Sequence, residues 1–517
     1  MFNSVLNSAL LYHIFCCFLF SQSCSAGSLG DEADRPERWD VRPSSQVALQ
    51  ENQRLSDIIS ASPLLSFHRS LCETESISGN ESTVGNYLVG YLRSHGFGVL
   101  RQEVEPEGED GEGSKRTRFN VFAWPRGNGS GQVSTDYDLK AEGEMEKDDQ
   151  LGDFIPKVIL SSHIDTVPPF IPFSLSYPST EKNRDELGKT EFNRSQILIH
   201  GRGTVDAKAC VAAQTHAVLS LLTQSNTRSQ PLPVALLFVV SEETLGSGMK
   251  TFSASPLHKH LSAPSSLTTT STSQGYKTVI FGEPTESRLA SGHKGLFAFS
   301  LVALGRAAHS GYPWLGVNAN NLLIDAVARI ARLGDIPVAE GGLARSEKYG
   351  NSTVNVGMIR GGVAINVVSE RAEARVAVRL AGGEVEEARD VIRRAVRRTA
   401  KENGVEFREG GRQGHGHTAE TGLLLEFFGP AYSPVDLDTD LLDDGNGDGD
   451  ELFGKPITVN YGTDVPNLTL QKKGVRRYLY GPGSILVAHG PREGLTVRDL
   501  EDSVRGYRKL IEDALSR

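Results

Sequence analysis

Short apolar runs of strand length alternate with amphipathic segments of helical period through the first 295 residues. Strands that alternate with helices in this way form a largely parallel sheet that is covered by helices on both faces. We therefore expect an α/β fold built on an open, mostly parallel sheet. The pattern predicts strands over 99–104, 118–125, 157–162, 234–240 and 277–281, and helices over 82–95 and 208–222.

The pattern changes after Gly295, where strands with one wet face become frequent. A β-α-β-β-α order follows, and it predicts a small α+β domain that is inserted into the first domain. Its strands are expected over 296–304, 353–360 and 372–380, and its helices over 318–333 and 384–403. The predicted organisation is a signal peptide at 1–26, an arm at 27–51, a main domain in two parts at 52–295 and 413–517, and the inserted domain at 296–412.

Length and charge narrow the class of protein. At 517 residues the chain is too long for one compact core and suits two domains with extensions. Its net charge of −10 and the absence of a basic stripe argue against binding to nucleic acid. The charged share of 23% is ordinary for a soluble globular protein, so composition adds little to the strand pattern.

The N-terminus has the pattern of a secretory signal. Residues 5–20 are largely apolar, and small residues follow up to a plausible cleavage point after Ala26. No Lys or Arg precedes the apolar run, so a membrane anchor is the alternative, although the run is short for a span. No other long apolar segment occurs in the sequence. We expect a secreted protein that has no membrane segment after its signal is cleaved.

Cysteine use and glycosylation sequons agree with an extracellular chain. Beyond the predicted signal only Cys72 and Cys210 remain, and they could pair, although nothing in the sequence requires it. Two cysteines are too few for a disulfide scaffold, so a large apolar core must stabilise the fold. Five Asn-x-Ser/Thr sequons are candidates for glycosylation: Asn80, Asn128, Asn193, Asn351 and Asn467.

Two adjacent acids, Glu242 and Glu243, directly follow the predicted strand 234–240 and Ser241. An open α/β sheet usually carries its chemistry at the carboxyl ends of its strands. Adjacent residues at a strand end point in different directions, so one acid could bind a metal while the other transfers a proton. The alternative is a solvated loop with two exposed acids, to which a Glu-Glu pair more often belongs.

Two further stretches place His and Asp beside predicted strands or helices. His163 and Asp165 follow strand 157–162, where a metal-binding imidazole could donate its other ring N–H to the acid. A hydrogen-bonded His–Asp pair without a metal fits this spacing equally well. Asp206 stands just before helix 208–222, so it could also be a simple N-cap. The glycines before it lack the spacing of nucleotide-binding loops.

Glu283, directly after strand 277–281 and a glycine, and His489, late in the chain, complete the set. Two histidines, three acidic ligands and one spare glutamate suit two zinc ions about 3.5–4 Å apart that share a bridging carboxylate. Four such features together are far less expected by chance than any one of them. By contrast, residues 444–449 imitate an EF-hand loop but have Lys455 at the twelfth position, so a solvated loop is favoured there.

Together these stretches resemble a known family. His-x-Asp-x-Val-Pro at 163–168, Gly-Arg-Gly-Thr-x-Asp-x-Lys at 201–208, Ser-Glu-Glu at 241–243 and Gly-Glu-Pro-Thr at 282–285 are similar in order and spacing to the motifs of the M20 metallopeptidases. The resemblance runs from about residue 60 to the end of the chain, and the secreted fungal carboxypeptidases of the family look most similar. The family includes carboxypeptidase G2, acetylornithine deacetylase and succinyl-diaminopimelate desuccinylase.

The resemblance implies a role for each residue of the set. Glu242 would be the general base, and Asp165 would orient His163. The main domain would be the catalytic domain, with a largely parallel sheet, and the inserted domain would be a lid that also serves in dimerisation. Two zinc ions per subunit would be held by a bridging Asp206 and by four residues that each bind one ion: His163, Glu243, Glu283 and His489.

The resemblance also assigns residues of the inserted lid domain. His309 would help to stabilise the oxyanion, in some members from the neighbouring subunit. Asn366 and Arg379 would hold the carboxylate of the substrate, and a homodimer through the lid is expected. Substrate choice cannot be carried over, because the chain departs from the family at Ala209 and in the insertions 127–153, 178–196 and 436–451.

The function that the resemblance implies is zinc-dependent hydrolysis of an amide or peptide bond next to a free carboxylate, as in a carboxypeptidase. A deacylase of N-acyl amino acids would use the same site, so a small peptide and an N-acyl amino acid are both candidate substrates. A third alternative, a non-catalytic secreted binding protein, is disfavoured because the ligand set and the base are all present.

Overall fold

The computed structural model describes most of the chain beyond the N-terminal region. The predicted signal, the sequon at Asn128 and most of each predicted insertion lie outside the described residues. Residues 50–517 form one compact unit, and all the sites discussed below belong to it. The described residues are 45–105, 117–126, 138–139, 151, 154–178, 192–224, 231–262, 275–410, 421–440 and 453–517.

The helices agree with the predicted ones to within a few residues. Helix α3 (Ser82–Ser94) ends two residues before Gly96, whose φ of +83° is a conformation that favours glycine. No helix within the described residues combines the length and apolar character needed to cross a bilayer. The other helices are α1 (Ser45–Ser60), α2 (Pro63–Glu73), α4 (Lys208–Gln224), α5 (Ser247–Ala254), α6 (Pro256–Ser262), α7 (Ala319–Ala331), α8 (Val385–Glu402) and α9 (Val497–Ser516).

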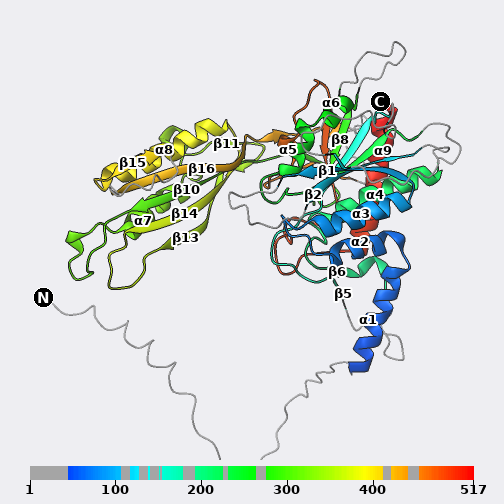
Figure 1. Cartoon of the computed structure of the whole chain (residues 1–517), viewed down its shortest axis with the longest axis horizontal. Coiled ribbons are helices and arrows are strands. Elements are labelled where there is room, and N and C mark those ends of the chain that lie inside the picture. The colour runs from blue at the N-terminus through cyan, green and yellow to red at the C-terminus, as the bar shows by residue number, and fades with distance from the viewer. Residues whose placement is uncertain are drawn as a thin grey trace, which may run out of the picture. The chain divides into compact units, whose positions relative to one another are not determined.

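A seven-stranded sheet forms the centre of the main domain (Figure 1). Four neighbouring strands run parallel, as predicted, whereas the next strand, the second of the hairpin at one side, is antiparallel to them. The order across the sheet is β19 (Arg476–Leu479), β8 (Thr278–Phe281), β4 (Val158–His163), β7 (Val234–Val239), β2 (Arg118–Pro125), β1 (Phe97–Val104) and β3 (Asp138–Leu139).

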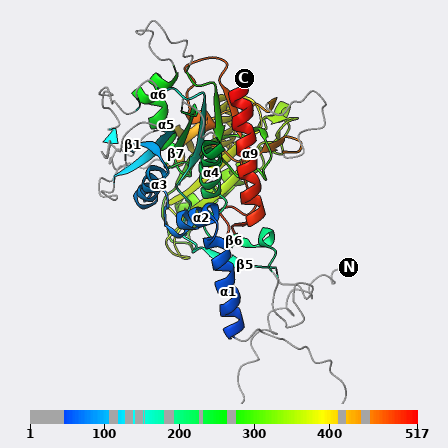
Figure 2. The same cartoon turned by 90° about the vertical axis from the view of Figure 1, so that its right-hand side faces the viewer.

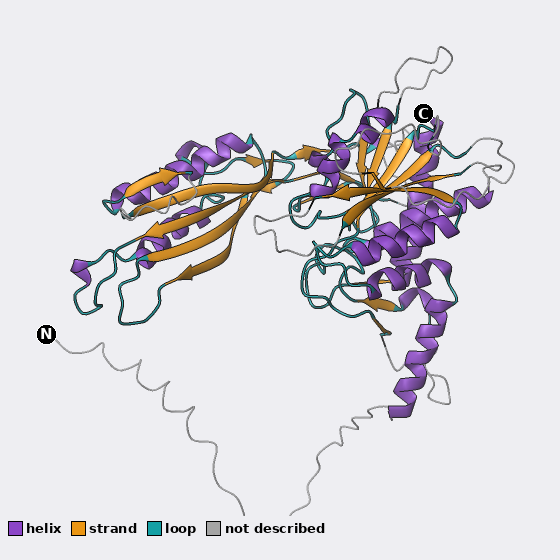
Figure 3. Cartoon of the chain, viewed as in Figure 1, coloured by secondary structure: helices purple, strands orange, loops and turns teal. Residues whose placement is uncertain are grey.

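Helices cover both faces of this sheet (Figures 2 and 3). Helices α2, α3, α4 and α9 pack on one face, where they share a core with Leu160 and Leu236. Helices α5 and α6 pack on the other face, against Ile159 and Leu237. All six residues of β7 are buried, which explains why its sequence is continuously apolar instead of alternating. The parallel strands are therefore held rigidly between two apolar layers.

The inserted domain is a five-stranded sheet with α7 and α8 on one face. Its last long strand continues to Tyr432, so the predicted boundary at 412 falls inside the sequence of this domain. The sequence prediction missed that strand, which is separated from the preceding one by residues 410–421. The strand order is β13 (Thr353–Gly361), β14 (Arg371–Leu380), β10 (Gly295–Leu304), β16 (Gly422–Tyr432) and β15 (Glu406–Glu409).

Within the described residues the protein also contains three small sheets and two cysteines. Cys72 and Cys210 are both free and buried, so they do not pair. The small sheets, which were not predicted, consist of β17 (Val435–Asp436), β9 (Ala290–His293) and β18 (Ile457–Val459); of β20 (Gly494–Thr496), β6 (Leu198–His200) and β5 (Ser174–Ser176); and of β11 (Arg345–Ser346) and β12 (Gly350–Asn351).

Candidate metal centre

The carboxyl ends of three neighbouring parallel strands carry three of the predicted acids and one of the histidines. His163 is the last residue of β4, and Glu283 follows β8 after one glycine. Glu242 and Glu243 follow β7 after a turn in which Ser241 has a φ of +61°, a value uncommon for a residue with a side chain. Parallel strands end at the same edge of a sheet, and for this reason residues far apart in sequence meet there.

Asp206 lies between two histidines. Its Oδ1 atom is 3.1 Å from Nε2 of His163, and its Oδ2 atom is 3.2 Å from Nε2 of His489. Asp206 is 5% exposed and stands two residues before α4. A carboxylate that offers one oxygen to each of two histidines has the arrangement of a bridging ligand. A simple helix N-cap would not explain these two contacts.

Each of these histidines also has a second acid nearby. Nε2 of His489 lies 3.0 Å from Oε2 of Glu243, and Nε2 of His163 lies 3.9 Å from Oε1 of Glu283. The structure therefore brings together all five predicted ligands. His489 comes from a loop before β20 and is half exposed, whereas His163 is buried.

The donor set fits divalent metal ions. One ligand atom each from His163, Asp206 and Glu243 lies within 4.8 Å of the others, and the same holds for His163, Glu242 and Glu283. Histidine nitrogens and carboxylate oxygens are the ligands that zinc takes in catalytic sites. Within the described residues, the carboxylate of Glu242 has neither a hydrogen bond nor an ion pair, so it is the acid of this group that is available for another task.

The electrostatics of the group show an excess of buried acid. Burial raises the pKa of Glu243 to about 7, and the nearby charge of Asp206 adds to this effect. Burial and the charge of Glu283 raise the pKa of Glu242 well above its usual value. Hydrogen bonds to Asp206 and Glu243 raise the pKa of His489 to about 10. Crowded carboxylates whose charge is disfavoured in this way are stabilised by a bound cation.

Asp165 contacts His163 and also has a task that was not predicted. Burial by itself opposes charge on His163, yet Asp165 and Asp206 raise its pKa well above the usual value. Nδ1 of His163 lies 3.0 Å from the backbone carbonyl of Asp165 and 3.5 Å from its carboxylate. The carboxylate also accepts hydrogen bonds from the backbone N–H groups of Glu242 (3.1 Å) and Glu243 (3.2 Å). Asp165 thus fixes the positions of both glutamates.

A buried ion pair that the sequence analysis missed supports Asp206. Nη1 of Arg202 donates to Oε2 of Glu493 over 2.6 Å, and both side chains are almost fully buried. Oε1 of Glu493 accepts from the backbone N–H of Asp206 at 3.2 Å, and Arg202 donates to the backbone carbonyl of His489 at 3.3 Å. The pair therefore connects the loops of two metal ligands. The arginine belongs to the Gly-Arg-Gly-Thr motif, but nothing in the sequence marks Glu493 as its partner.

Asp464 is a second residue for which the sequence analysis gave no role. It is 5% exposed, and its Oδ2 atom has no partner within the described residues. Burial raises its pKa to about 6. Its Oδ1 atom accepts a hydrogen bond from the amide of Asn467 at 2.8 Å. The nitrogen that would carry a glycan at this sequon is therefore engaged next to the site.

The three predicted residues of the inserted domain, His309, Asn366 and Arg379, form no hydrogen bond or ion pair with the metal ligands within the described residues. His309 is exposed, and its Nδ1 atom accepts a hydrogen bond from the backbone of Gly311 at 3.0 Å. Asn366 is exposed too, and within the described residues no ion pair or hydrogen bond joins either residue to the metal ligands. Arg379 is half-buried and approaches Gly462, two residues before Asp464.

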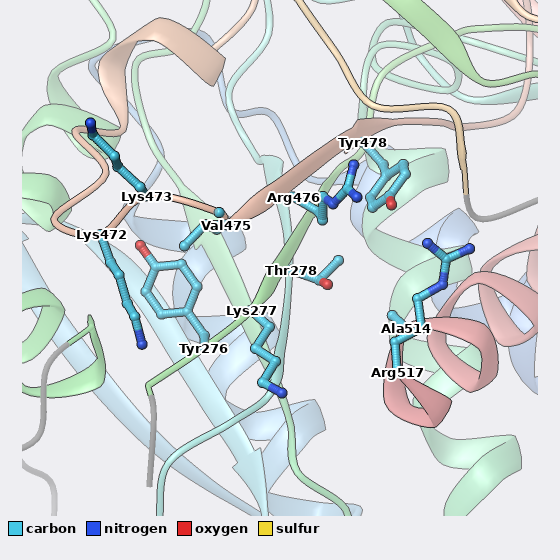
Figure 4. A pocket seen from close by; sticks show the side chains of 11 residues that line it. Tyr276, Lys277, Thr278, Lys472, Lys473, Val475, Arg476, Tyr478, Ala514 and Arg517 are labelled. Atoms are coloured by element: carbon cyan, nitrogen blue, oxygen red, sulfur yellow. The ribbon is translucent and has the colours of Figure 1, made fainter.

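A separate hollow lies at the opposite, amino ends of β8 and β19 (Figure 4). Its volume is about 350 Å³, and its lining includes Lys277, Lys472 and Arg476. Arg476 forms an ion pair with Asp438 at 2.8 Å. The lining contains several cations but no histidine, cysteine or acid, so it offers no metal ligands.

Comparison with known proteins identifies the family to which the chain belongs. The chain is 45% identical to the "Probable carboxypeptidase" of Uncinocarpus reesii over 474 residues, which cover 90% of each chain. It is 44% identical to the "Probable carboxypeptidase" of Arthroderma otae over 476 residues, which cover 92% of this chain and 90% of that one. Residues 291–406 match the family described as the peptidase dimerisation domain of M20 proteins. The chain belongs to the M20 metallopeptidases.

Solved structures agree on the fold. The M20 metallo-carboxypeptidase of Sulfolobus solfataricus aligns with a TM-score of 0.56 at 15% identity and covers 88% of this chain and all of its own. The dipeptidase Dug1p of Saccharomyces cerevisiae aligns with a TM-score of 0.60 at 11% identity and covers 91% of this chain and 99% of its own. The α/β fold with an inserted domain is thus the M20 fold, and the protein is a metal-dependent hydrolase of this family.

Proposed function

We propose that this M20 peptidase is a secreted, zinc-dependent carboxypeptidase that cleaves the amide bond next to the free carboxylate of a small peptide. Asp206 provides the strongest support, because its two oxygens reach two different histidines, each of which has a further acid beside it. In this proposal Asp206 would help to hold both zinc ions. The remaining ligands are His163 and Glu283 for one ion, and Glu243 and His489 for the other.

Glu242 is the general base of the proposed reaction. Zinc, when bound, polarises the scissile carbonyl and lowers the pKa of a water molecule towards about 7. The carboxylate of Glu242 shares a ligand group with His163 and Glu283 and has no partner of its own within the described residues. It takes a proton from the attacking water and passes the proton to the leaving nitrogen. Asp165 holds the backbone of Glu242 in place for both transfers.

Secretion and dimerisation are part of the same proposal. The apolar segment at 5–20 and the small residues up to Ala26 support a cleaved signal. The exposed Asn193 and Asn351 are the sequons best suited to carry glycans, whereas the amide of Asn467 is engaged by Asp464. The match of residues 291–406 to a dimerisation domain supports a homodimer through the lid, with His309 and Asn366 serving the substrate.

A deacylase of N-acyl amino acids is the alternative, because it would need the same ligands and base. A panel of dipeptides, N-acetyl amino acids and longer N-acyl amino acids separates the two, measured with and without a chelator. We expect hydrolysis of dipeptides that have a free carboxylate, loss of this activity with the chelator, and its return when Zn²⁺ is added. Faster turnover of the acyl amino acids would replace the carboxypeptidase proposal by the deacylase. Zinc-free protein that hydrolyses nothing would favour a binding protein.

A further inference from the structure

We propose that Tyr432 binds substrate, by donating a hydrogen bond from its phenol to the free carboxylate that Arg379 also recognises. Tyr432 has no role in the sequence prediction or in the proposed metal centre. This inference rests on the proposed function and deepens it, since it explains how the enzyme would select a substrate with a free carboxylate. Two observations support it. One is the backbone register of the five-stranded sheet of the inserted domain, which we call the lid sheet. The other is the approach of two side chains to one glycine.

The register of the lid sheet places Tyr432 and Arg379 on the same face. Leu296 of β10 pairs with Arg379 of β14 on one side and with Tyr432 of β16 on the other. Residues that pair across antiparallel strands project to the same face of the sheet. The neighbours Phe297 and Val378 are buried in the core under α7 and α8, so Arg379 and Tyr432 project from the opposite face.

An irregularity in β16 is needed for this alignment. Ala298 pairs with Phe428, and the next pair on this side joins Leu296 to Tyr432. A regular ladder would place residue 430, a proline, opposite Leu296, because two residues on one strand face two on the other. The two additional residues in β16 therefore put the tyrosine into the row of Arg379.

The two side chains meet at Gly462. A Cβ atom added to this glycine would lie 1.9 Å from the hydroxyl oxygen of Tyr432 and 3.2 Å from Nη1 of Arg379. The polar ends of both residues thus approach one point, and they can do so because residue 462 has no side chain. Gly462 lies in the same loop as Asp464, the buried acid beside the metal centre.

Tyr432 packs against His293 and lies near Glu242. Its ring packs edge-on against His293, with centroids 5.9 Å apart, and Nε2 of His293 lies 3.1 Å from the hydroxyl of Thr463. Burial raises the pKa of Tyr432, and the nearby charge of Glu242 raises it further. The phenol therefore stays protonated and can donate a hydrogen bond.

The chemistry of the pair specifies an anionic ligand. Within the described residues, neither the guanidinium of Arg379 nor the hydroxyl of Tyr432 has a hydrogen-bond partner or an ion pair. A guanidinium offers only donors, and the phenol adds one more. Arginine matches the planar geometry of a carboxylate, so the terminal carboxylate of a substrate fits the pair.

The test measures binding without turnover. Tyr432→Phe is made in a Glu242→Gln background that is loaded with zinc, and calorimetry gives the Kd of an N-acetyl amino acid and of its C-terminal amide. We expect the Kd of the acid to rise by about 10–100-fold in the tyrosine variant, the usual effect of losing a hydrogen bond to a charged group, while the Kd of the amide stays within about threefold. Gly462→Ala should raise the Kd of the acid in the same way, because the new methyl group displaces the phenol of Tyr432.

The matched control is Tyr87→Phe, which removes the hydroxyl of a half-buried tyrosine on α3 and should change neither Kd. An unchanged Kd for the acid in Tyr432→Phe would overturn the inference. An equal rise in the Kd of the acid and of the amide would also overturn it, and so would a Glu242→Gln protein that binds neither ligand. Turnover of the substrate panel by the wild-type enzyme is measured separately. The proposed function can therefore fail while the carboxylate site stands, or stand while the carboxylate site fails.

Discussion

The two ends of the parallel strands have opposite chemistry. Beyond their carboxyl ends lie His163 and Glu283, which are buried beside further acids. At the amino ends of β8 and β19, Lys277 and Arg476 are exposed around a hollow of about 350 Å³ (Figure 4). The hollow at the amino ends contains no metal ligands. The metal ligands lie at the other end, where charged groups are buried.

The difference teaches that the burial of charged groups indicates the site better than the presence of a hollow does. An isolated buried carboxylate is strongly destabilising unless it is paired, hydrogen-bonded or bound to a metal. The metal centre gathers four carboxylates, and the buried Asp165 and Glu493 hold the backbone of its residues. Such an accumulation of unfavourable charge persists where function requires it. The exposed lysines at the amino ends carry no comparable cost.

The largest effect is expected from Glu242→Gln, which keeps the shape of the side chain but removes the base. Metal content should remain at the wild-type level, while kcat falls by about 10²–10⁴-fold, the usual contribution of a general base. Metal analysis and initial rates on the best substrate of the panel measure both quantities. The control is Glu286→Gln, an exposed acid three residues after Glu283, which should stay within about twofold. Turnover near the wild-type rate in Glu242→Gln would remove the residue from the mechanism.

The next effect concerns the buried pair of Arg202 and Glu493. Glu493→Gln leaves the guanidinium of Arg202 buried without its anion, and this should lower the free energy of unfolding by about 3–5 kcal/mol. Affinity for zinc should fall by about 10–100-fold, because the backbone of Asp206 loses its anchor. Urea denaturation of the zinc-free protein and competition with a zinc chelator measure the two effects separately.

The control for this variant is Glu501→Gln, because Glu501 pairs with Arg194 at the surface. An exposed pair contributes at most about 1 kcal/mol, so its loss should be small. Equal destabilisation by the two substitutions would contradict the special role of the buried pair. A stable Glu493→Gln protein with unchanged zinc affinity would show that Asp206 is positioned without it.

The sequence predicted most of the fold and the ligands because both follow local patterns. Strands such as β7 are read from continuous apolar runs, and the acids stand directly beyond them. The family motifs then assembled ligands that are far apart in the chain. The strand β16 was missed, since its apolar run ends in a Gly-Pro irregularity that only its partner β10 explains. Local patterns therefore identify elements but not their register.

Residues whose partners come from other parts of the fold could not be predicted. Glu493 meets Arg202 across 291 positions of sequence, and neither residue indicates the other. Tyr432 reaches Gly462 only through the register of the lid sheet. Asp165 was predicted to orient His163, but its hydrogen bonds to the backbone of both glutamates could not be predicted, because they depend on where the end of β7 lies. Such roles depend on tertiary packing.

The smallest effect is expected at the amino ends of the strands. The double variant Lys472→Ala/Lys473→Ala removes two exposed cations from the hollow that Figure 4 shows, where the two side chains point apart. Exposed substitutions away from special features usually change stability by less than about 0.5 kcal/mol. We expect kcat/KM to stay within about twofold, as measured on the same substrate at low and at moderate salt. A loss of tenfold or more at low salt would mean that this end of the sheet contributes to function, and that buried charge alone does not locate the working surface of the enzyme.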